Sequence, residues 1–317
     1  MSEEKLPLVS VIVPSYNQGH FIQETIDSIL NQNYPRIEIL VMDGGSKDDT
    51  LKVLEKYAGN SRIQCKSEKD RGQADAINKG FAAAQGDILA WLNSDDTYLP
   101  DALVRQVQFL RENPAIDVVY GDAVYTKADG ARCGTYYARE FSPSELCRLC
   151  FIPQPSVFMR RQVYERSGPL DLKLHFALDY EYWLRAIFHS SFAYNRGFVA
   201  TYRLHGDSKT VSGITDFNPE VEKIVLKALN TERAPSDLVK NRENLLADLY
   251  LNLGSSCARA GDRGAALVQL RKSLTYRIFR PRLFWFASFF LVGEKTTTLL
   301  AQNWTRWRSK VSFKTEV

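Results

Sequence analysis

The sequence predicts an α/β protein in which a mostly parallel sheet flanked by helices is followed by an all-helical C-terminal region. Over the first hundred residues, short apolar runs alternate with helical periodicity, as in successive βαβ units. A hairpin signal and shorter strand-like runs follow in the middle of the chain. After about residue 217 the strand signals end, and residues 219–310 read as helical throughout.

Four strands and three helices are expected in the first hundred residues. The strands at 8–13, 37–42 and 88–92 are nearly continuous apolar runs, which are typical of strands covered on both faces, and residues 62–66 form a weaker strand. Apolar residues at helical spacing follow Ile22 and Ala74. Ser46, with Asp49 three residues later, reads as the start of the helix between them.

The middle of the chain changes character. Asp129 and Gly130 form a hairpin turn signal between strand-like runs at 118–125 and 132–137. Ser142 and Glu145 make a capping box, with proline at the first helical position. A strand at 156–159, a helix at 178–188 and a last strand at 198–204 are then expected.

Composition narrows the class of protein. Hydrophobic residues make up 44% and charged residues 25%, which excludes a mostly disordered chain, a collagen and a coiled-coil rod. With 41 Lys and Arg against 37 Asp and Glu, the formal charge is +4, so a nucleic-acid partner is not indicated. Residues 271–317 carry ten basic and two acidic residues, a net +8, which leaves 4 − 8 = −4 for the remainder. An acidic body with a basic tail suggests two roles.

A cytoplasmic protein is expected. No run of about 18 apolar residues is present, and the first five residues lack the features of a secretion signal. The five cysteines are odd in number and scattered, which argues against a disulfide framework. Cys147 and Cys150 form a lone CxxC pair without a second pair to complete a zinc site.

Polar clusters follow three of the predicted strands, at the edge where ligands bind open parallel sheets. They are residues 14–17, 43–46 and 93–96. Asp95 and Asp96 repel each other when both are ionised, and Mg²⁺ or Mn²⁺ would relieve that repulsion. The alternative is a solvated turn leading into a helix near Pro100. The chain has neither GxxxxGK[ST] nor GxGxxG, which argues against an ATPase and a dinucleotide-dependent dehydrogenase.

Taken together in order and spacing, several motifs resemble family 2 of the inverting glycosyltransferases. They are VSVIVPSYN at 9–17, DGGSKDDT at 43–50, DRGQ at 70–73 with NKG at 78–80, NSDD at 93–96, QPSVF at 154–158, LDYEYWLR at 178–185 and YRLH at 202–205. The resemblance covers about residues 7–210. It implies a GT-A fold, a nucleotide-diphosphate-sugar donor, most plausibly a UDP-sugar, and a hexosyltransferase-type activity.

Carried over residue by residue, the resemblance implies a donor site, a metal site and a base. Donor-binding positions are Pro14, Ser15, Tyr16, Asn17, Asp43, Arg71 and Asp95. Asp96 and His205 match metal-binding positions for Mg²⁺ or Mn²⁺, and Asp179 matches the catalytic base. The glutamate that usually precedes this base is replaced by Leu178. Glu181 is a competing carboxylate, but a spacing of two places it on a different helix face.

The predicted function is inverting transfer of a sugar to an acceptor hydroxyl, in the synthesis of a cell-surface polysaccharide or glycoconjugate. The acceptor is a glycan or a lipid-linked molecule. The alternative is a catalytically degenerate scaffold whose helical tail recruits partners. A nucleotidyltransferase ranks below both, because no glycine-rich phosphate loop follows the first strand.

Two domains are predicted, a glycosyltransferase domain at 1–217 and a helical region at 218–317. Within the second, residues 250–270 resemble one tetratricopeptide-like helical hairpin, too few repeats for a free repeat module. Basic and aromatic residues alternate from Arg277 onward. Two roles are open for this tail: peripheral binding to an anionic membrane surface, or packing on the catalytic domain.

Overall fold

The computed structural model describes residues 6–206, 208–209, 217–232 and 234–276. Contacts divide the chain into two compact units, Met1–Val239 and Lys240–Val317. The strands are β1 Val9–Ser15, β2 Ile37–Asp43, β3 Ile63–Ser67, β4 Ile88–Trp91, β5 Val118–Lys127, β6 Arg132–Tyr136, β7 Phe158–Arg160 and β8 Phe192–Leu204. The helices are α1 Ile22–Leu30, α2 Thr50–Glu55, α3 Gln73–Ala83, α4 Ala102–Glu112, α5 Pro143–Arg148, α6 Arg161–Ser167, α7 Leu178–Ala186, α9 Phe217–Leu229, α10 Ser236–Arg259 and α11 Arg263–Tyr276.

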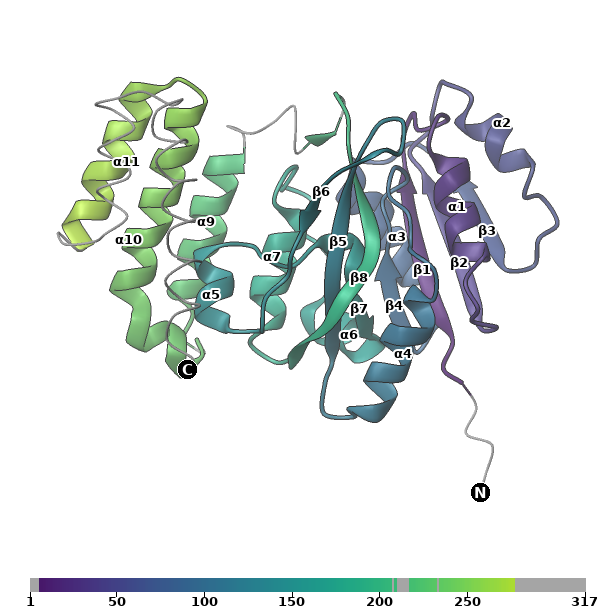
Figure 1. The fold of residues 1–317 in the computed structure, drawn as a ribbon, viewed down its shortest axis with the longest axis horizontal. Coiled ribbons are helices and arrows are strands. Elements are labelled where there is room, and N and C mark those ends of the chain that lie inside the picture. Colours follow the sequence, from purple (N-terminus) through teal and green to yellow (C-terminus); the bar gives the residue numbers. More distant parts are fainter. Residues whose placement is uncertain (1–5, 207, 210–216, 233, 277–317) are drawn as a thin grey trace, which may run out of the picture. The chain divides into compact units, whose positions relative to one another are not determined.

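The described strands of the first unit form one sheet in the order β3-β2-β1-β4-β7-β5-β6, with β8 also paired to β5 (Figure 1). Strands β3, β2, β1 and β4 run parallel to one another. The short strand β7 runs antiparallel between β4 and β5. Strand β8 pairs parallel with β5, on the side away from β7. The mostly parallel sheet with flanking helices that the sequence predicted is confirmed.

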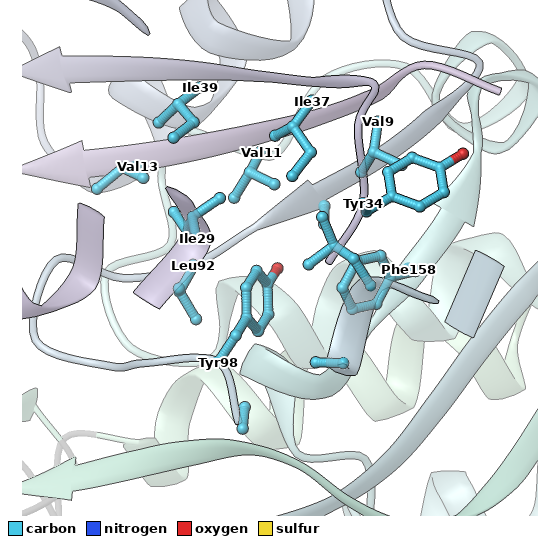
Figure 2. Close-up of a cluster of buried hydrophobic side chains, with 14 of the residues drawn as sticks. Val9, Val11, Val13, Ile29, Tyr34, Ile37, Ile39, Leu92, Tyr98 and Phe158 are labelled. Atoms are coloured by element: carbon cyan, nitrogen blue, oxygen red, sulfur yellow. The ribbon is translucent and has the colours of Figure 1, made fainter. Parts of the chain in front are cut away.

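Both faces of the central strands are buried, which explains their continuous apolar runs. Val9, Val11 and Val13 join one apolar cluster with residues of α1, α4 and neighbouring strands (Figure 2). Because side chains alternate along a strand, Ile12 points to the opposite face. There it meets α3, where an added Cβ on Gly80 would lie 2.4 Å from the Cγ2 of Ile12. Glycine therefore allows α3 to approach β1 closely.

Several boundaries differ from the sequence prediction. Helix α2 begins at Thr50 rather than at Ser46, because the Ser46 hydroxyl donates to Asp43 and accepts from the backbone of Asn17. The capping box at Ser142 is confirmed, since its hydroxyl accepts the N–H of Glu145. Strand β8 begins six residues before the predicted start. Its first half includes Asn195 and Gly197, which carry little strand signal.

Helix α9 belongs to the first unit, where it packs on α7. In the second unit, α10 and α11 form a helical hairpin whose small core contains Leu251, Cys257, Ala258 and Ala266. The hydroxyl of Ser273 donates to the carbonyl of Ala247 across this hairpin, at 2.7 Å. No helix in the described part of the chain is long and apolar enough to cross a bilayer. The basic aromatic tail from Arg277 lies outside the described residues.

The contact between α3 and β1 gives a prediction for stability. Gly80→Ala should lower the free energy of unfolding by about 1–3 kcal/mol, because the new methyl group overlaps the Ile12 side chain. In an Ile12→Ala background the same change should cost little, since the overlapping atoms are gone. Urea denaturation of both single variants and the double variant measures this coupling. Equal costs in the two backgrounds would contradict the packing argument.

Candidate functional site

The strand exits that carry the polar clusters lie at one edge of the sheet. Ser15, the last residue of β1, pairs in register with Asp43, the last residue of β2. The N–H of Leu92, just beyond β4, donates to the carbonyl of Ile12 on β1. Parallel alignment therefore places the ends of β1, β2 and β4 together, with the Asp95–Asp96 turn following β4.

The Asp43 carboxylate organises its own loop. It is 2% exposed and accepts the N–H groups of Gly45 and Ser46, each at 3.0 Å, and the Ser67 hydroxyl at 2.6 Å. The Ser46 hydroxyl also donates to it. Gly45 has a φ of 81°, which favours glycine and lets this turn close. A pocket adjoins the loop and is lined by Met42, Asp43, Lys66, Glu68, Asp70, Ala76 and Lys79.

The other predicted donor residues differ in their surroundings. Pro14 is buried in β1, and Tyr16 is 57% exposed at its end. Asn17 joins two loops, because its N–H donates to Ser46 and its side-chain oxygen accepts the N–H of Lys47. Arg71 has a 72% exposed side chain and pairs with Asp75 at 3.0 Å.

The hydroxyl of Ser15 is buried without a hydrogen-bond partner among the described residues. The residue is 5% exposed. A buried hydroxyl without a partner costs free energy, so such a group is often completed by a ligand or water. Its place at the edge of the sheet fits a ligand bound between the ends of β1 and β2.

Asp95 and Asp96 face different partners. The Oδ2 of Asp95 lies 3.0 Å from the Nε2 of His205. Asp96 is 2% exposed and its Oδ1 accepts the N–H of Arg203 at 2.8 Å. Burial, followed by the charge of Asp95, raises the pKa of Asp96 well above its usual value. The structure therefore brings His205 to Asp95 and not to Asp96.

The side-chain atoms of Asp95 and His205 suit a divalent cation that a bound ligand also coordinates. Asp95 and His205 bring a carboxylate oxygen and an imidazole nitrogen to one point, a combination that suits Mn²⁺. No group of three or more His, Cys, Asp and Glu side chains converges within the described ranges. Two protein ligands leave coordination positions for phosphate oxygens, as is common where a metal binds together with a nucleotide.

Arg203 holds the Asp95–Asp96 turn in place. Its guanidinium donates to the carbonyls of Asp95 and Ala128, each at 2.8 Å, and pairs with Glu24. It also lies over the ring of Phe21, 4.9 Å from the centroid. These contacts join the end of β8 to α1 and to the β5–β6 hairpin. The Arg203 side chain is only 3% exposed.

Asp179 lies in the first turn of α7, where the helix dipole favours a negative charge. The residue is half-buried, and burial of its carboxyl group raises its pKa to about 6. The N–H groups of Tyr180 and Asp179 and the charge of Lys209 oppose that rise. A carboxylate with such a pKa is suited to accept a proton near neutral pH.

Glu181 has a different environment from Asp179. It is 4% exposed and bonds to the Arg185 guanidinium at 2.8 Å, and Lys227 of α9 lies 3.4 Å from its other oxygen. Both oxygens of this carboxylate are therefore engaged by cationic side chains. The next two residues, Tyr182 and Trp183, are fully buried in the core.

Two residues without a sequence signal hold the segment before Asp179. Glu220 of α9 accepts the N–H groups of His175, Phe176 and Ala177 at 2.7, 2.9 and 2.8 Å. Lys209 donates to the carbonyl of His175 at 2.7 Å. Both contacts join segments more than thirty residues apart in the chain. The short-range periodicity of a sequence cannot predict such long-range contacts.

Lys209 also connects this segment with the Asp95–Asp96 turn. Its ammonium group donates to the side-chain oxygen of Gln73 at 2.8 Å. Gln73 in turn donates to Asn93 at 2.8 Å, and Asn93 donates to Gln154 at 3.3 Å. A continuous chain of hydrogen bonds therefore runs from the end of β4 to the start of α7. Gln73, Asn93 and Gln154 lay in the motifs noted above, without assigned roles.

Sequence comparison places these residues in a family. The model of the glycosyl transferase family 2 matches residues 10–167. A PGL/p-HBAD biosynthesis glycosyltransferase of Mycobacterium bovis (strain BCG / Pasteur 1173P2) is 30% identical over 208 residues, 63% of this chain and 78% of that protein. The chondroitin synthase of Pasteurella multocida (strain Pm70) is 28% identical over 243 residues, 76% of this chain. The matched segment spans only 25% of that synthase.

Solved structures share the fold. Staphylococcus aureus TarS 1–349 in complex with UDP-GlcNAc has a TM-score of 0.63 at 17% identity, covering 86% of this chain and 93% of that one. The mannosyltransferase PcManGT from Pyrobaculum calidifontis, in complex with GDP-Man and Mn²⁺, has a TM-score of 0.62 at 19% identity, covering 89% and 84%. The architecture is therefore the GT-A fold of glycosyltransferases. The chain belongs to glycosyltransferase family 2.

The anchoring of the segment before α7 can be tested directly. Glu220→Gln should speed hydrogen exchange at the backbone N–H groups of residues 175–177 roughly tenfold. The reason is that the NH₂ group of the glutamine side chain, unlike the carboxylate oxygen it replaces, cannot accept a hydrogen bond. Glu232→Gln is the matched control, since Glu232 is exposed. Exchange measured by NMR or mass spectrometry compares both with the unchanged chain. Equal protection in the Glu220 variant would show that the three bonds do not hold this segment.

Proposed function

We propose that this family 2 glycosyltransferase moves a sugar from a nucleotide diphosphate sugar, in the first place a UDP-sugar, to an acceptor hydroxyl with inversion. The acceptor is a glycan or a lipid-linked molecule in the synthesis of a cell-surface polysaccharide or glycoconjugate. The carrying observation is that hydrogen bonds link Asn93, whose carbonyl accepts the N–H of Asp96, to the segment before Asp179. Names of the related proteins agree with this class of reaction.

The donor is proposed to lie along the ends of β1, β2 and β4. The unpaired hydroxyl of Ser15 and the loop ordered by Asp43 would contact the nucleoside. Asp95 and His205 would hold Mg²⁺ or Mn²⁺ together with the diphosphate, while Asp96 orders the turn through Arg203. When bound, such a cation offsets the charge that grows on the leaving diphosphate.

Asp179 is proposed to act as the base. It takes the proton from the acceptor hydroxyl while that oxygen bonds to the anomeric carbon of the donor. The bond from that carbon to the phosphate oxygen breaks, and its electron pair leaves with the nucleotide diphosphate. Attack opposite the leaving group inverts the configuration. The protein contributes mainly alignment and electrostatic stabilisation.

We also propose that the protein is cytoplasmic. A role for the tail at an anionic membrane surface would concern residues outside the described ranges. The scaffold alternative is less well supported, because burial raises the pKa of Asp179 to about 6 and the Asp95 carboxylate lies 3.0 Å from His205.

The proposed function is tested by incubating the full chain with UDP- and GDP-sugars and Mn²⁺ and measuring nucleotide release. Asp179→Asn should retain nucleotide binding and lower turnover by about two to four powers of ten, because the amide cannot accept the proton. Asp129→Asn, at the exposed hairpin turn, is the matched control. Release at unchanged rates from Asp179→Asn would refute the base, and no release with any donor would refute the function.

Metal binding separates the two adjacent carboxylates. Mn²⁺ should strengthen UDP binding to the unchanged chain. Asp95→Asn should reduce this increase in UDP affinity at least about tenfold. Asp96→Asn should retain most of it, since an amide oxygen still accepts the N–H of Arg203. Calorimetric titration of UDP with and without Mn²⁺ measures both variants. A larger loss in Asp96→Asn would assign the metal to Asp96.

The pH dependence of transfer tests the electrostatics around Asp179. The base must be ionised, so kcat/KM should fall below a pH near its pKa of about 6. Lys209 lowers that pKa, so Lys209→Met should raise it and move the acidic limb to higher pH. Lys209→Arg retains the positive charge and should leave the limb near its original position. An unmoved limb in Lys209→Met would show that Lys209 does not act on the base.

A further inference from the structure

Strands β6, β5 and β8 lie side by side in the sheet (Figure 1). Three tyrosines form a row on one face of this part of the sheet. Tyr125 of β5 pairs in register with Tyr202 of β8 and with Gly134 of β6, two residues from Tyr136. Because side chains alternate along strands, the three rings share a face. The rings of Tyr125 and Tyr136 are 5.7 Å apart at 19°, and those of Tyr125 and Tyr202 are 5.6 Å apart at 73°. These residues are called the tyrosine row below.

The tyrosine row is partly open to solvent. All three residues are half-buried, unlike the aromatic residues of the core such as Tyr182 and Trp183. Gly134 contributes to this exposure, since an added Cβ there would lie 3.4 Å from the ring of Tyr125. Its backbone is not in a conformation that requires glycine. The missing side chain therefore leaves room beside the central ring.

The two ends of the row adjoin segments that carry proposed site residues. At one end, the Tyr136 hydroxyl donates to the carbonyl of Cys150 at 2.9 Å, which fixes its ring. The residue after Asp179 binds the same segment, because the Tyr180 hydroxyl donates to the carbonyls of Leu146 and Cys147 at 2.7 and 3.0 Å. At the other end, Tyr202 lies on β8, three residues before His205. The row therefore runs from the segment that contacts the start of α7 to the strand that leads to His205.

Aromatic rings in this arrangement suit a sugar. The C–H groups on a pyranose face carry partial positive charge and pack against the negative face of an aromatic ring. Polar hydroxyls of the sugar remain free for hydrogen bonds at the edges. We infer that the tyrosine row binds the acceptor as a glycan with at least two adjacent pyranose rings, leading its reactive hydroxyl to Asp179. This inference rests on the proposed function, and it favours a glycan over the lipid portion of a lipid-linked acceptor.

The test uses the full chain with UDP and Mn²⁺ and three probes: chondroitin tetrasaccharide, chitotetraose and cellotetraose. At least one should bind in calorimetric titration. Tyr125→Leu should weaken that binding roughly 3- to 10-fold, because an aliphatic side chain lacks the aromatic face. Gly134→Val keeps every ring but fills the space beside Tyr125, and it should weaken binding as well. Tyr137→Leu is the matched control, since Tyr137 is 63% exposed and follows Tyr136 directly.

The outcomes separate this inference from the proposed function. Binding of UDP or GDP by each variant is measured in parallel and also shows that the variant is folded. If a nucleotide binds but no tetrasaccharide does, or if Tyr125→Leu and Gly134→Val both bind the probe like the unchanged chain, the tyrosine row is not the acceptor site. If neither nucleotide binds the unchanged chain, the proposed function fails first.

Discussion

The candidate site depends on the way the end of β8 folds against the turn that follows β4. The N–H of Arg203 bonds to Asp96, its guanidinium bonds to the Asp95 carbonyl, and His205 reaches the Asp95 carboxylate. Thr201 adds a bond to Thr97 within the same contact, at 2.7 Å. The N-terminal strands thus form one edge of the site and β8 completes it. Without that contact, two adjacent aspartates would lie on an unsupported turn.

This constraint explains which parts the sequence could predict. Strands β1, β2 and β4 were recognisable because both of their faces are buried, which makes apolar runs unavoidable. The polar clusters after them were recognisable because parallel strands end at a common edge. The first half of β8 was missed because it is only partly buried and carries Asn195, Arg196 and Gly197, so its pairing with β5 is set by tertiary contacts.

The contacts between side chains within the site were harder to predict than the location of the site. The motif contains two aspartates in succession, and nothing in their order shows which one meets His205. The answer comes from the backbone N–H of Arg203, which engages Asp96 and leaves Asp95 facing the imidazole. Glu220 and Lys209 were not predicted because they act through backbone groups of residues 175–177, and backbone groups leave no mark on side-chain patterns.

Two carboxylates in one helix show how environment, rather than residue type, assigns a role. Glu181 is buried with Arg185 and Lys227, so its negative charge is matched and its oxygens are occupied. Asp179 is half-buried beside backbone N–H groups and the charge of Lys209, which stabilise the ionised form of its carboxyl group less than burial opposes it. This arrangement raises the pKa of Asp179 and gives its carboxylate appreciable affinity for a proton near neutral pH. The replacement of the usual glutamate by Leu178 leaves these surroundings in place, because burial and helix position act on Asp179 directly.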